Sequence, residues 1–265
     1  MQYGRAPDDE AGTLVCRAQG AFGPLLVLDK GPFRHLRFGG RDGVDQTVIH
    51  RRRPGDLPTE YLKVATVGAA LTKSFSRALL VGLGGGSYAR FLRSRFPKAV
   101  IEVIEIDPIV IQLAREHFGV REDRRLRVFS EDAGHFVADA AADPDWRYDL
   151  VFIDAYHGQK IPAPLARQSF FRAAAEIVSP GGVVVANLGL PERWQEDRVA
   201  RRFAAAFRGG CIELAVPEED NRILIGCADG RPGGRRLRAA LRELDARKVV
   251  PFRLETYAGE VRMWP

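Results

Sequence analysis

Short apolar runs alternate with helical patterns between about residues 75 and 227. The runs are rich in strand-forming residues, and each of the first five leads into a stretch whose apolar residues recur every three or four positions. This alternation predicts strand–helix units that build a parallel sheet. A short charged link joins the last two runs, so we expect five parallel strands followed by an antiparallel pair. The predicted strands are 78–83, 100–106, 126–130, 148–154, 182–188, 212–216 and 223–227, and the predicted helices are 87–95, 108–118, 134–141, 164–178 and 192–207.

The segments on either side of this α/β region have different patterns. Short apolar runs separated by turn residues predict a small antiparallel β-unit, which packs on the main domain or on a second subunit. The first twenty residues begin polar, and we expect them to be loosely held. A helix from 60 to about 73, capped by Thr59, follows, and a basic helix at 235–247 precedes an irregular tail. The predicted strands of the β-unit are 25–28, 33–38 and 46–49, and the predicted division is 1–60 β-unit, 61–74 connecting helix, 75–228 nucleotide-binding domain and 229–265 C-terminal extension.

A glycine turn ends the first strand of the α/β region. Gly84, Gly85 and Gly86 follow the strand directly, and a helix begins at once. Glu105 ends the second strand about 20 positions later, the spacing at which an acid reaches ribose hydroxyls. Asp107 and Pro108 then open the next helix as N-cap and first turn. These features predict a nucleotide site, and the glycine pattern alone leaves NAD open as a ligand.

Two further carboxylates follow strands of the same sheet. Asp132 follows the third strand, where an acid can accept a hydrogen bond from an adenine amino group, and Asp154 ends the fourth strand. Ligands bind at the carboxyl edge of open α/β sheets, so we expect both side chains at one site, with Tyr156 and His157 beside Asp154. Asp154 is the candidate base. The alternatives are that Asp132 only caps the next helix and that Asp154 is a structural cap.

Composition and charge narrow the partners and the chemistry. The chain has 265 residues, a formal charge of +6 and a pI near 9.5, but its arginines are scattered in short clusters, so we expect no nucleic-acid partner. The sequence shows neither an apolar run of 18 residues nor a secretion leader, and the three cysteines lie far apart, which favours a cytoplasmic protein without a membrane partner. No spacing of His, Cys and acids predicts a metal.

Taken together, the motifs resemble the spermidine synthase family of polyamine aminopropyltransferases and its spermidine-synthase-like class I methyltransferase relatives. The resemblance covers about residues 23–227. It implies a Rossmann-like, seven-stranded class I methyltransferase sheet with a small N-terminal antiparallel β-domain, and residues 75–228 as the binding domain for S-adenosylmethionine (SAM). The motifs on which the resemblance rests are VGLGGG at 81–86, VIEIDP at 103–108, EDA at 131–133, YDLVFIDA at 148–155, Phe170 with Phe171, SPGGVVVAN at 179–187, and LVLD at 26–29 with Gln46 and Tyr61.

The resemblance also implies the ligands and the residues that hold them. The expected donor is SAM or its decarboxylated form, and the expected acceptor is a small molecule, an amine. The resemblance implies no metal and is compatible with a homodimer. Asp154, Tyr156 and His157 are the predicted catalytic residues, and Tyr61 joins Tyr156 and His157 in binding the acceptor. The predicted donor-binding residues are Gly82, Gly84, Gly85, Gly86, Ser87, Glu105, Ile106, Asp132, Ala133 and Gln46.

Two departures from the family pattern bear on the transferred group. The family's synthases carry an aspartate in the glycine turn, where Ser87 stands in this chain, and a second aspartate three places after the catalytic one, where His157 stands. Both lost carboxylates face cations in the synthases, so methyl transfer from SAM is slightly favoured. The alternatives are a true aminopropyltransferase, a nicotinamide-dependent oxidoreductase and a nucleoside-binding module without turnover. An alkylamine has a pKa of about 10.4. Both methyl transfer and aminopropyl transfer to such an amine therefore need a group such as Asp154 to accept a proton.

Overall fold

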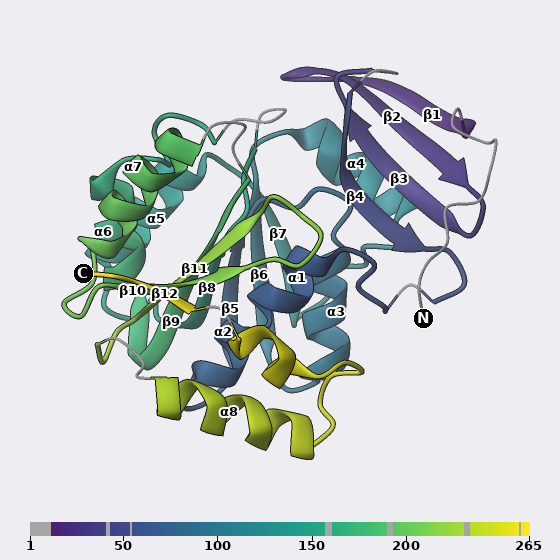
Figure 1. Ribbon diagram of the computed structural model, residues 1–265. Coiled ribbons are helices and arrows are strands. Elements are labelled where there is room, and N and C mark those ends of the chain that lie inside the picture. The colour runs from purple at the N-terminus through teal and green to yellow at the C-terminus, as the bar shows by residue number, and fades with distance from the viewer. Residues whose placement is uncertain are drawn as a thin grey trace.

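The computed structural model describes residues 12–40, 43–53, 55–156, 161–189, 193–230, 234–259 and 261–265. These residues form two sheets, a small N-terminal one and a large central one with helices on both faces (Figure 1). The predicted class I methyltransferase-like α/β fold with an N-terminal antiparallel unit is confirmed.

The central sheet has the strand order β12-β10-β11-β9-β8-β5-β6-β7 among the described residues. The strands from β5 to β9 run parallel, and β11, β10 and β12 pair antiparallel in turn. The predicted parallel strands and the antiparallel pair are therefore confirmed, and β12 adds an eighth strand where an irregular tail was expected. The bounds are β5 Arg77–Val81, β6 Val100–Glu105, β7 Leu126–Ser130, β8 Tyr148–Ile153, β9 Val178–Leu188, β10 Cys211–Ala215, β11 Arg222–Cys227 and β12 Val261–Trp264.

Helices cover both faces of the central sheet because successive residues of each strand point to opposite sides. In β5, Leu80 packs with the helices on one face, and Leu79 packs with those on the other. The first face carries α1, α2, α3 and α8, the second carries α5, α6 and α7, and α4 lies between the first face and the N-terminal sheet. The bounds are α1 Glu60–Ala65, α2 Val67–Leu71, α3 Ser87–Arg95, α4 Pro108–His117, α5 Ala133–Ala142, α6 Gln168–Glu176, α7 Arg193–Ala204, α8 Gly234–Ala246 and the 3-10 helix η1 Leu254–Ala258.

Three predicted helix positions differ from the structure. The helix expected at 60–73 is divided at Thr66 into α1 (Glu60–Ala65) and α2 (Val67–Leu71), and the Thr66 hydroxyl donates to Leu62 O at 2.8 Å. Thr59 occupies the cap position but makes no side-chain cap bond. The helix expected from 164 begins only at Gln168, because the proline-bearing stretch before it forms turns.

The N-terminal sheet is a four-stranded meander of β1 Thr13–Gly20, β2 Gly23–Lys30, β3 Phe33–Phe38 and β4 Val44–His50. The expectation that the first twenty residues are loosely held is wrong for 13–20, which pair with β2 along the whole strand. The start of the chain, 1–11, lies outside the described residues. Figure 1 shows this sheet beside α4, and its apolar side packs on that helix: Leu25, Val27, Leu36 and Ile49 contact Val110, Leu113 and Phe118.

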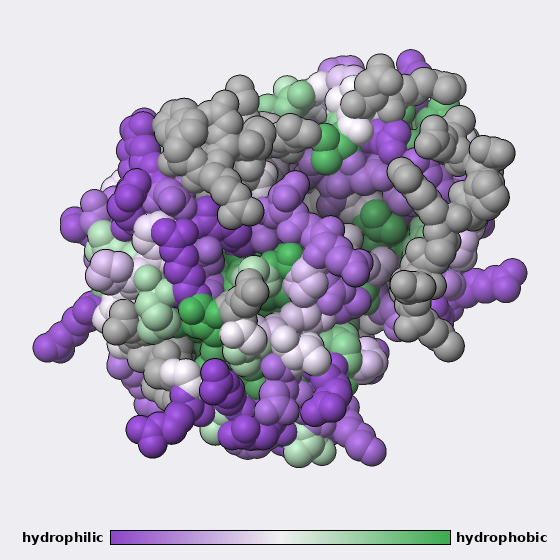
Figure 2. All heavy atoms as spheres, in the orientation of Figure 1, coloured by the Kyte–Doolittle hydropathy of each residue, from purple (hydrophilic) through white to green (hydrophobic). Residues whose placement is uncertain are grey.

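On the face seen in Figure 2, hydrophilic residues surround small hydrophobic patches. No described helix combines the length and the hydropathy that a membrane span requires.

Candidate active site

A cavity of about 350 Å³ lies over the carboxyl ends of β5, β6, β7 and β8. Ligand sites of open α/β sheets occur at this edge, and small-molecule pockets begin at about this size. The fold brings eleven of the predicted site residues to the cavity wall. They are Gln46, Tyr61, Gly82, Gly84, Ser87, Glu105, Ile106, Asp132, Ala133, Asp154 and Tyr156.

The glycine turn forms the floor between β5 and α3. Gly82 has φ +100°, and a Cβ there would lie 2.3 Å from the carbonyl oxygen of Asp154, so only glycine fits. Gly85 and Gly86 do not line the cavity, unlike their neighbours in the turn. Gly85 faces Phe118 and Thr47, and its N–H donates to Thr47 Oγ1 at 2.8 Å, while Gly86 faces Val120. These two glycines shape the turn and join it to the N-terminal sheet.

Glu105 lies at the end of β6 with both carboxylate oxygens held by backbone. Oε2 accepts from the N–H of Leu83 at 3.0 Å, and Oε1 accepts from the N–H of Asp107 at 3.0 Å. Burial raises the pKa of this carboxyl, and the backbone N–H groups of Asp107, Leu83 and Gly84 oppose that rise. The side chain is therefore fixed at the cavity wall beside the glycine turn.

Asp107 and Asp132 both act as helix caps. Asp107 Oδ1 accepts from Ile109 N at 2.9 Å at the start of α4, as predicted, and Oδ2 accepts from Ala21 N at 2.7 Å, which ties the β1–β2 turn to the site. Asp132 Oδ1 accepts from His135 N at 3.1 Å at the start of α5. The capping alternative for Asp132 is thus realised, and the residue lines the cavity as well.

Asp154 follows β8 and accepts two side-chain hydrogen bonds. Oδ2 accepts from the Tyr61 hydroxyl at 3.1 Å, and Oδ1 accepts from Asn187 Nδ2 at 2.9 Å. Asn187 is itself held by Asn221, whose Nδ2 donates to Asn187 Oδ1 at 2.9 Å. Burial raises the pKa of Asp154 to about 6, against the opposing effect of the Asn187 and Tyr61 hydrogen bonds. A carboxylate with a pKa in this range suits proton transfer near neutral pH.

Tyr156 lines the cavity, but its hydroxyl is engaged by backbone. It donates to Asn187 O at 2.8 Å and accepts from Gly189 N at 2.7 Å, so it joins the segment after β8 to the end of β9. This arrangement favours a structural role for the hydroxyl over the predicted catalytic one. His157, the third predicted catalytic residue, lies outside the described residues.

Sequence reasoning missed several residues of the site. Tyr88 lines the cavity with a buried hydroxyl that has no hydrogen-bond partner among the described residues; Thr66 lies beside it but outside hydrogen-bond geometry. Asn187 lies next to Asp154, one residue before the end of β9, so a search for the last polar residue of each strand would also have found it. Thr47 and Asn221 come from distant segments, and no local pattern marks them.

The charges around the cavity are of one sign. Every charged side chain among the described lining residues is acidic, in a chain whose net charge is +6. Within the same described residues, no group of three or more His, Cys, Asp or Glu is placed to hold a metal ion. A cavity walled in this way favours a cationic ligand. The acidic lining residues are Glu105, Asp107, Glu131, Asp132 and Asp154.

The sheet order and a cavity over its carboxyl ends, closed by a glycine turn and strand-end acids, define a class I methyltransferase-like transferase. Comparison with known protein families then identifies the family to which this transferase belongs. The Spermine/spermidine synthase domain matches residues 60–204, which is more than half of the chain. The protein belongs to this family, and the predicted resemblance is confirmed.

Individual relatives fall into two groups. The chain is 26% identical to a polyamine aminopropyltransferase of Vibrio vulnificus over 246 residues, which are 92% of this chain and 81% of that protein. It is 33% identical to the human eEF1A lysine and N-terminal methyltransferase over 137 residues, which are 49% of this chain and 20% of that protein. These relatives confirm a SAM-type transferase. They do not support the slight preference for methyl transfer, because the match over nearly the whole chain is to an aminopropyltransferase.

Solved structures have a similar fold. A probable spermidine synthase from Corynebacterium glutamicum has the same fold, with a TM-score of 0.70 at 20% identity over 85% of this chain and 86% of that one. Human methyltransferase-like protein 13, solved in complex with SAH, has a TM-score of 0.61 at 26% identity over 78% of this chain and 96% of that one.

Proposed function

We propose that the protein transfers an aminopropyl group from decarboxylated SAM to a small amine. The observation that carries the proposal is Asp154, whose carboxyl has a pKa raised by burial to about 6 and stands in the wall of an acid-lined cavity. The relative that matches 92% of the chain is a polyamine aminopropyltransferase, which supports this choice of transferred group.

The nucleoside part of the donor is proposed to bind at the glycine turn, Glu105 and Asp132. A carboxylate offers about four acceptor positions, and each Glu105 oxygen uses one of them for a backbone N–H. The carboxylate therefore keeps acceptor capacity for a ribose hydroxyl. Gly82 and Gly84 line the cavity and carry no side chain, so a ligand can approach the backbone of the turn closely.

Asp154 is proposed to act on the acceptor in two ways. An amine with a pKa of about 10.4 arrives as a cation. The carboxylate attracts this cation and accepts hydrogen bonds from its N–H groups. A protonated nitrogen has no lone pair, so Asp154 would accept a proton from it before the neutral amine attacks. The new bond from nitrogen to carbon would form as the bond between that carbon and the donor's sulfur breaks, and the sulfur would leave as a neutral thioether. The donor, when bound, supplies a carbon attached to a positively charged sulfur. Tyr61 and Asn187 hold Asp154 in one orientation throughout, which preserves the attack geometry.

Methyl transfer from SAM is the second candidate. The glycine turn from Gly82 to Tyr88 contains no acidic residue, and Ser87 lines the cavity at the start of α3. A turn without a carboxylate offers no group that selects a donor amine over the amino acid end of SAM. The methyltransferase relatives are consistent with this candidate.

The test is a paired incubation of the protein with putrescine and either decarboxylated SAM or SAM, read by mass spectrometry. We expect a product heavier by an aminopropyl group with the first donor, and none when Asp154→Asn replaces the wild type. If a product forms only with SAM and is heavier by a methyl group, the result would favour the second candidate, methyl transfer. Binding of neither nucleoside in calorimetry would overturn both.

The oligomeric state and the compartment are separate predictions from the sequence. Light scattering of the purified protein checks the homodimer, and fractionation of cells checks the cytoplasmic location. Neither result bears on the transferred group.

A further inference from the structure

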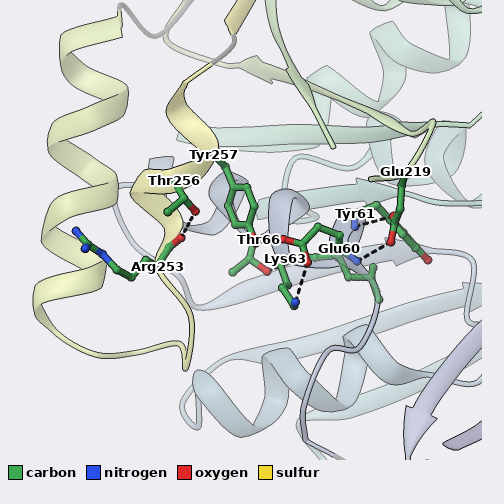
Figure 3. A network of polar contacts seen from close by, with 9 residues as sticks. Glu60, Tyr61, Lys63, Thr66, Glu219, Arg253, Thr256 and Tyr257 are labelled. Atoms are coloured by element: carbon green, nitrogen blue, oxygen red, sulfur yellow. Dashed lines mark hydrogen bonds and ion pairs between the residues drawn. The ribbon is translucent and has the colours of Figure 1, made fainter. Parts of the chain in front are cut away.

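The N-terminus of α1, the first helix of the site, is capped by a residue that is distant in the sequence. Glu219 lies in the hairpin between β10 and β11, and its two carboxylate oxygens accept from Glu60 N at 2.8 Å and from Tyr61 N at 3.0 Å (Figure 3). The residue at the local cap position, Thr59, leaves its own hydroxyl buried and without a partner among the described residues. The first turn of α1 is therefore held by the hairpin rather than by its own sequence.

The residue that Glu219 holds is the one that reaches Asp154. The Tyr61 N–H donates to Glu219 Oε2, while the hydroxyl at the far end of the same side chain donates to Asp154 Oδ2 at 3.1 Å. Glu219 and Asp154 thus hold Tyr61 at its two ends. A shift of the α1 backbone would move the hydroxyl away from the carboxylate, because the ring is rigid between them.

A second contact supports the same turn from outside. The Tyr257 hydroxyl, in the 3-10 helix of the C-terminal extension, donates to Glu60 Oε1, and Lys63 Nζ donates to Glu60 Oε2 at 2.7 Å. Figure 3 shows Glu60 between Tyr257 and Lys63, with Glu219 on the other side of the turn. The turn that carries Tyr61 is therefore clamped between the hairpin and the C-terminal extension.

We propose that Glu219 is a positioning residue for the active site, which fixes Tyr61 so that its hydroxyl stays hydrogen-bonded to Asp154. Beyond Tyr61, the titratable groups that face this arrangement are Tyr88 from α3, Tyr156 after β8, and Glu60, Lys63 and Tyr257 around the first turn of α1. The inference deepens the proposed role of Asp154, but its test needs no substrate.

The test follows the Asp154 carboxyl by carbon-13 NMR in the free protein, with the signal assigned from Asp154→Asn. Glu219→Asp keeps the charge and shortens the reach by one methylene. Loss of the Tyr61 hydrogen bond removes a contact that favours the ionised form, so we expect the pKa of Asp154 to rise. Tyr61→Phe sets the upper limit of this rise, about one pH unit. Adding Glu219→Asp to Tyr61→Phe should produce no further rise, because the two changes break the same contact.

The sign of the change separates positioning from a charge effect. Glu219→Gln removes a negative charge, which by itself lowers the pKa of Asp154, whereas loss of positioning raises it. The matched control is Glu218→Asp. Glu218 directly precedes Glu219 and is exposed, and this substitution also shortens the side chain by one methylene. It should leave the pKa of Asp154 unchanged. An unchanged Asp154 in Glu219→Asp, or a lower pKa in Glu219→Gln, would overturn the proposal, and either result can be obtained whether or not the protein transfers an aminopropyl group.

Discussion

Asn187 and Asp154 are joined across neighbouring parallel strands by a hydrogen bond of 2.9 Å from Nδ2 to Oδ1. The register pairs Ile153 of β8 with Ala186 of β9, so the next residue of each strand lies side by side at the sheet edge. Asn187 is 5% exposed and receives a hydrogen bond from Asn221 on its other atom, which fixes the orientation of its amide. The central sheet itself therefore orients the candidate base.

Replacing Asn187 by Leu should move the pH dependence of activity. The amide hydrogen bond lowers the pKa of Asp154 from the value that burial alone would give, so its loss should raise that pKa above about 6. The acidic limb of the kcat/KM profile should then shift to higher pH, with full activity recovered at high pH. The control is Gln112→Leu, which also replaces an amide side chain by Leu but at an exposed position on α4. It should leave the pH profile unchanged.

Asp154→Asn should greatly reduce turnover while preserving the site. General-base catalysis contributes about 10²–10⁴-fold, so kcat should fall by at least a hundredfold. Binding of the nucleoside product, measured by calorimetry, should change little, because Glu105 and the glycine turn are untouched. Wild-type turnover in this variant would remove Asp154 from the mechanism.

The same substitution should stabilise the fold at high pH. Burial raises the pKa of Asp154 to about 6, above its ordinary value of 3.8, so the folded state binds this proton more tightly than the unfolded chain does. The free energy of unfolding should therefore fall as pH rises from about 4 through 6, by on the order of 2 kcal/mol. Urea unfolding of Asp154→Asn should lack this fall, and equal pH slopes for the two proteins would contradict the environment described for the carboxyl.

Glu105→Gln should weaken nucleoside binding. An amide has one oxygen, so it cannot accept from both Leu83 N and Asp107 N, and its NH₂ group would face one of these donors. We expect a loss of affinity of about tenfold or more in calorimetry, since hydrogen bonds to charged groups are worth about 1.5–3 kcal/mol. Glu116→Gln, an exposed position on α4, is the control and should bind as the wild type does.

Tyr88→Phe should have opposite effects on stability and on binding. The Tyr88 hydroxyl is buried at the cavity wall and lacks a partner among the described residues, and such a group costs about 1–3 kcal/mol. Its removal should raise the melting temperature of the free protein. If the bound ligand satisfies this hydroxyl, the variant should bind more weakly than the wild type; a variant that is no more stable would mean that the hydroxyl is hydrated.

The hydrophobic pattern was sufficient for the seven predicted strands of the central sheet. In six of these strands the apolar residues are buried in continuous runs, whereas β7 is only partly buried. The pattern failed where pairing, not periodicity, makes the strand. β1 carries polar residues on one side and is held by its register with β2, and β12 is four residues long and is held by β10.

The site was predictable as far as it depends on strand ends. Glu105, Asp132 and Asp154 could be placed together because parallel strands end at one edge of a sheet. The strand pattern does not place the residues that contact these acids. Tyr61 is expected only from the family resemblance, and Glu219 and Asn221 reach the site from segments far apart in the sequence. Thr59 shows the limit most clearly: the residue type fits a helix cap, but the cap is supplied by Glu219, 160 positions away.

The strand β12 has a consequence for solubility. It covers β10, whose backbone N–H and C=O groups would otherwise form an open sheet edge, and Trp264 Nε1 anchors it by donating to Glu213 at 2.7 Å. Bare edges invite pairing with another chain, and a charged side chain on the outermost strand, here Arg262, discourages it. Shortening the chain before Val261 should therefore promote aggregation even though the catalytic cavity is untouched.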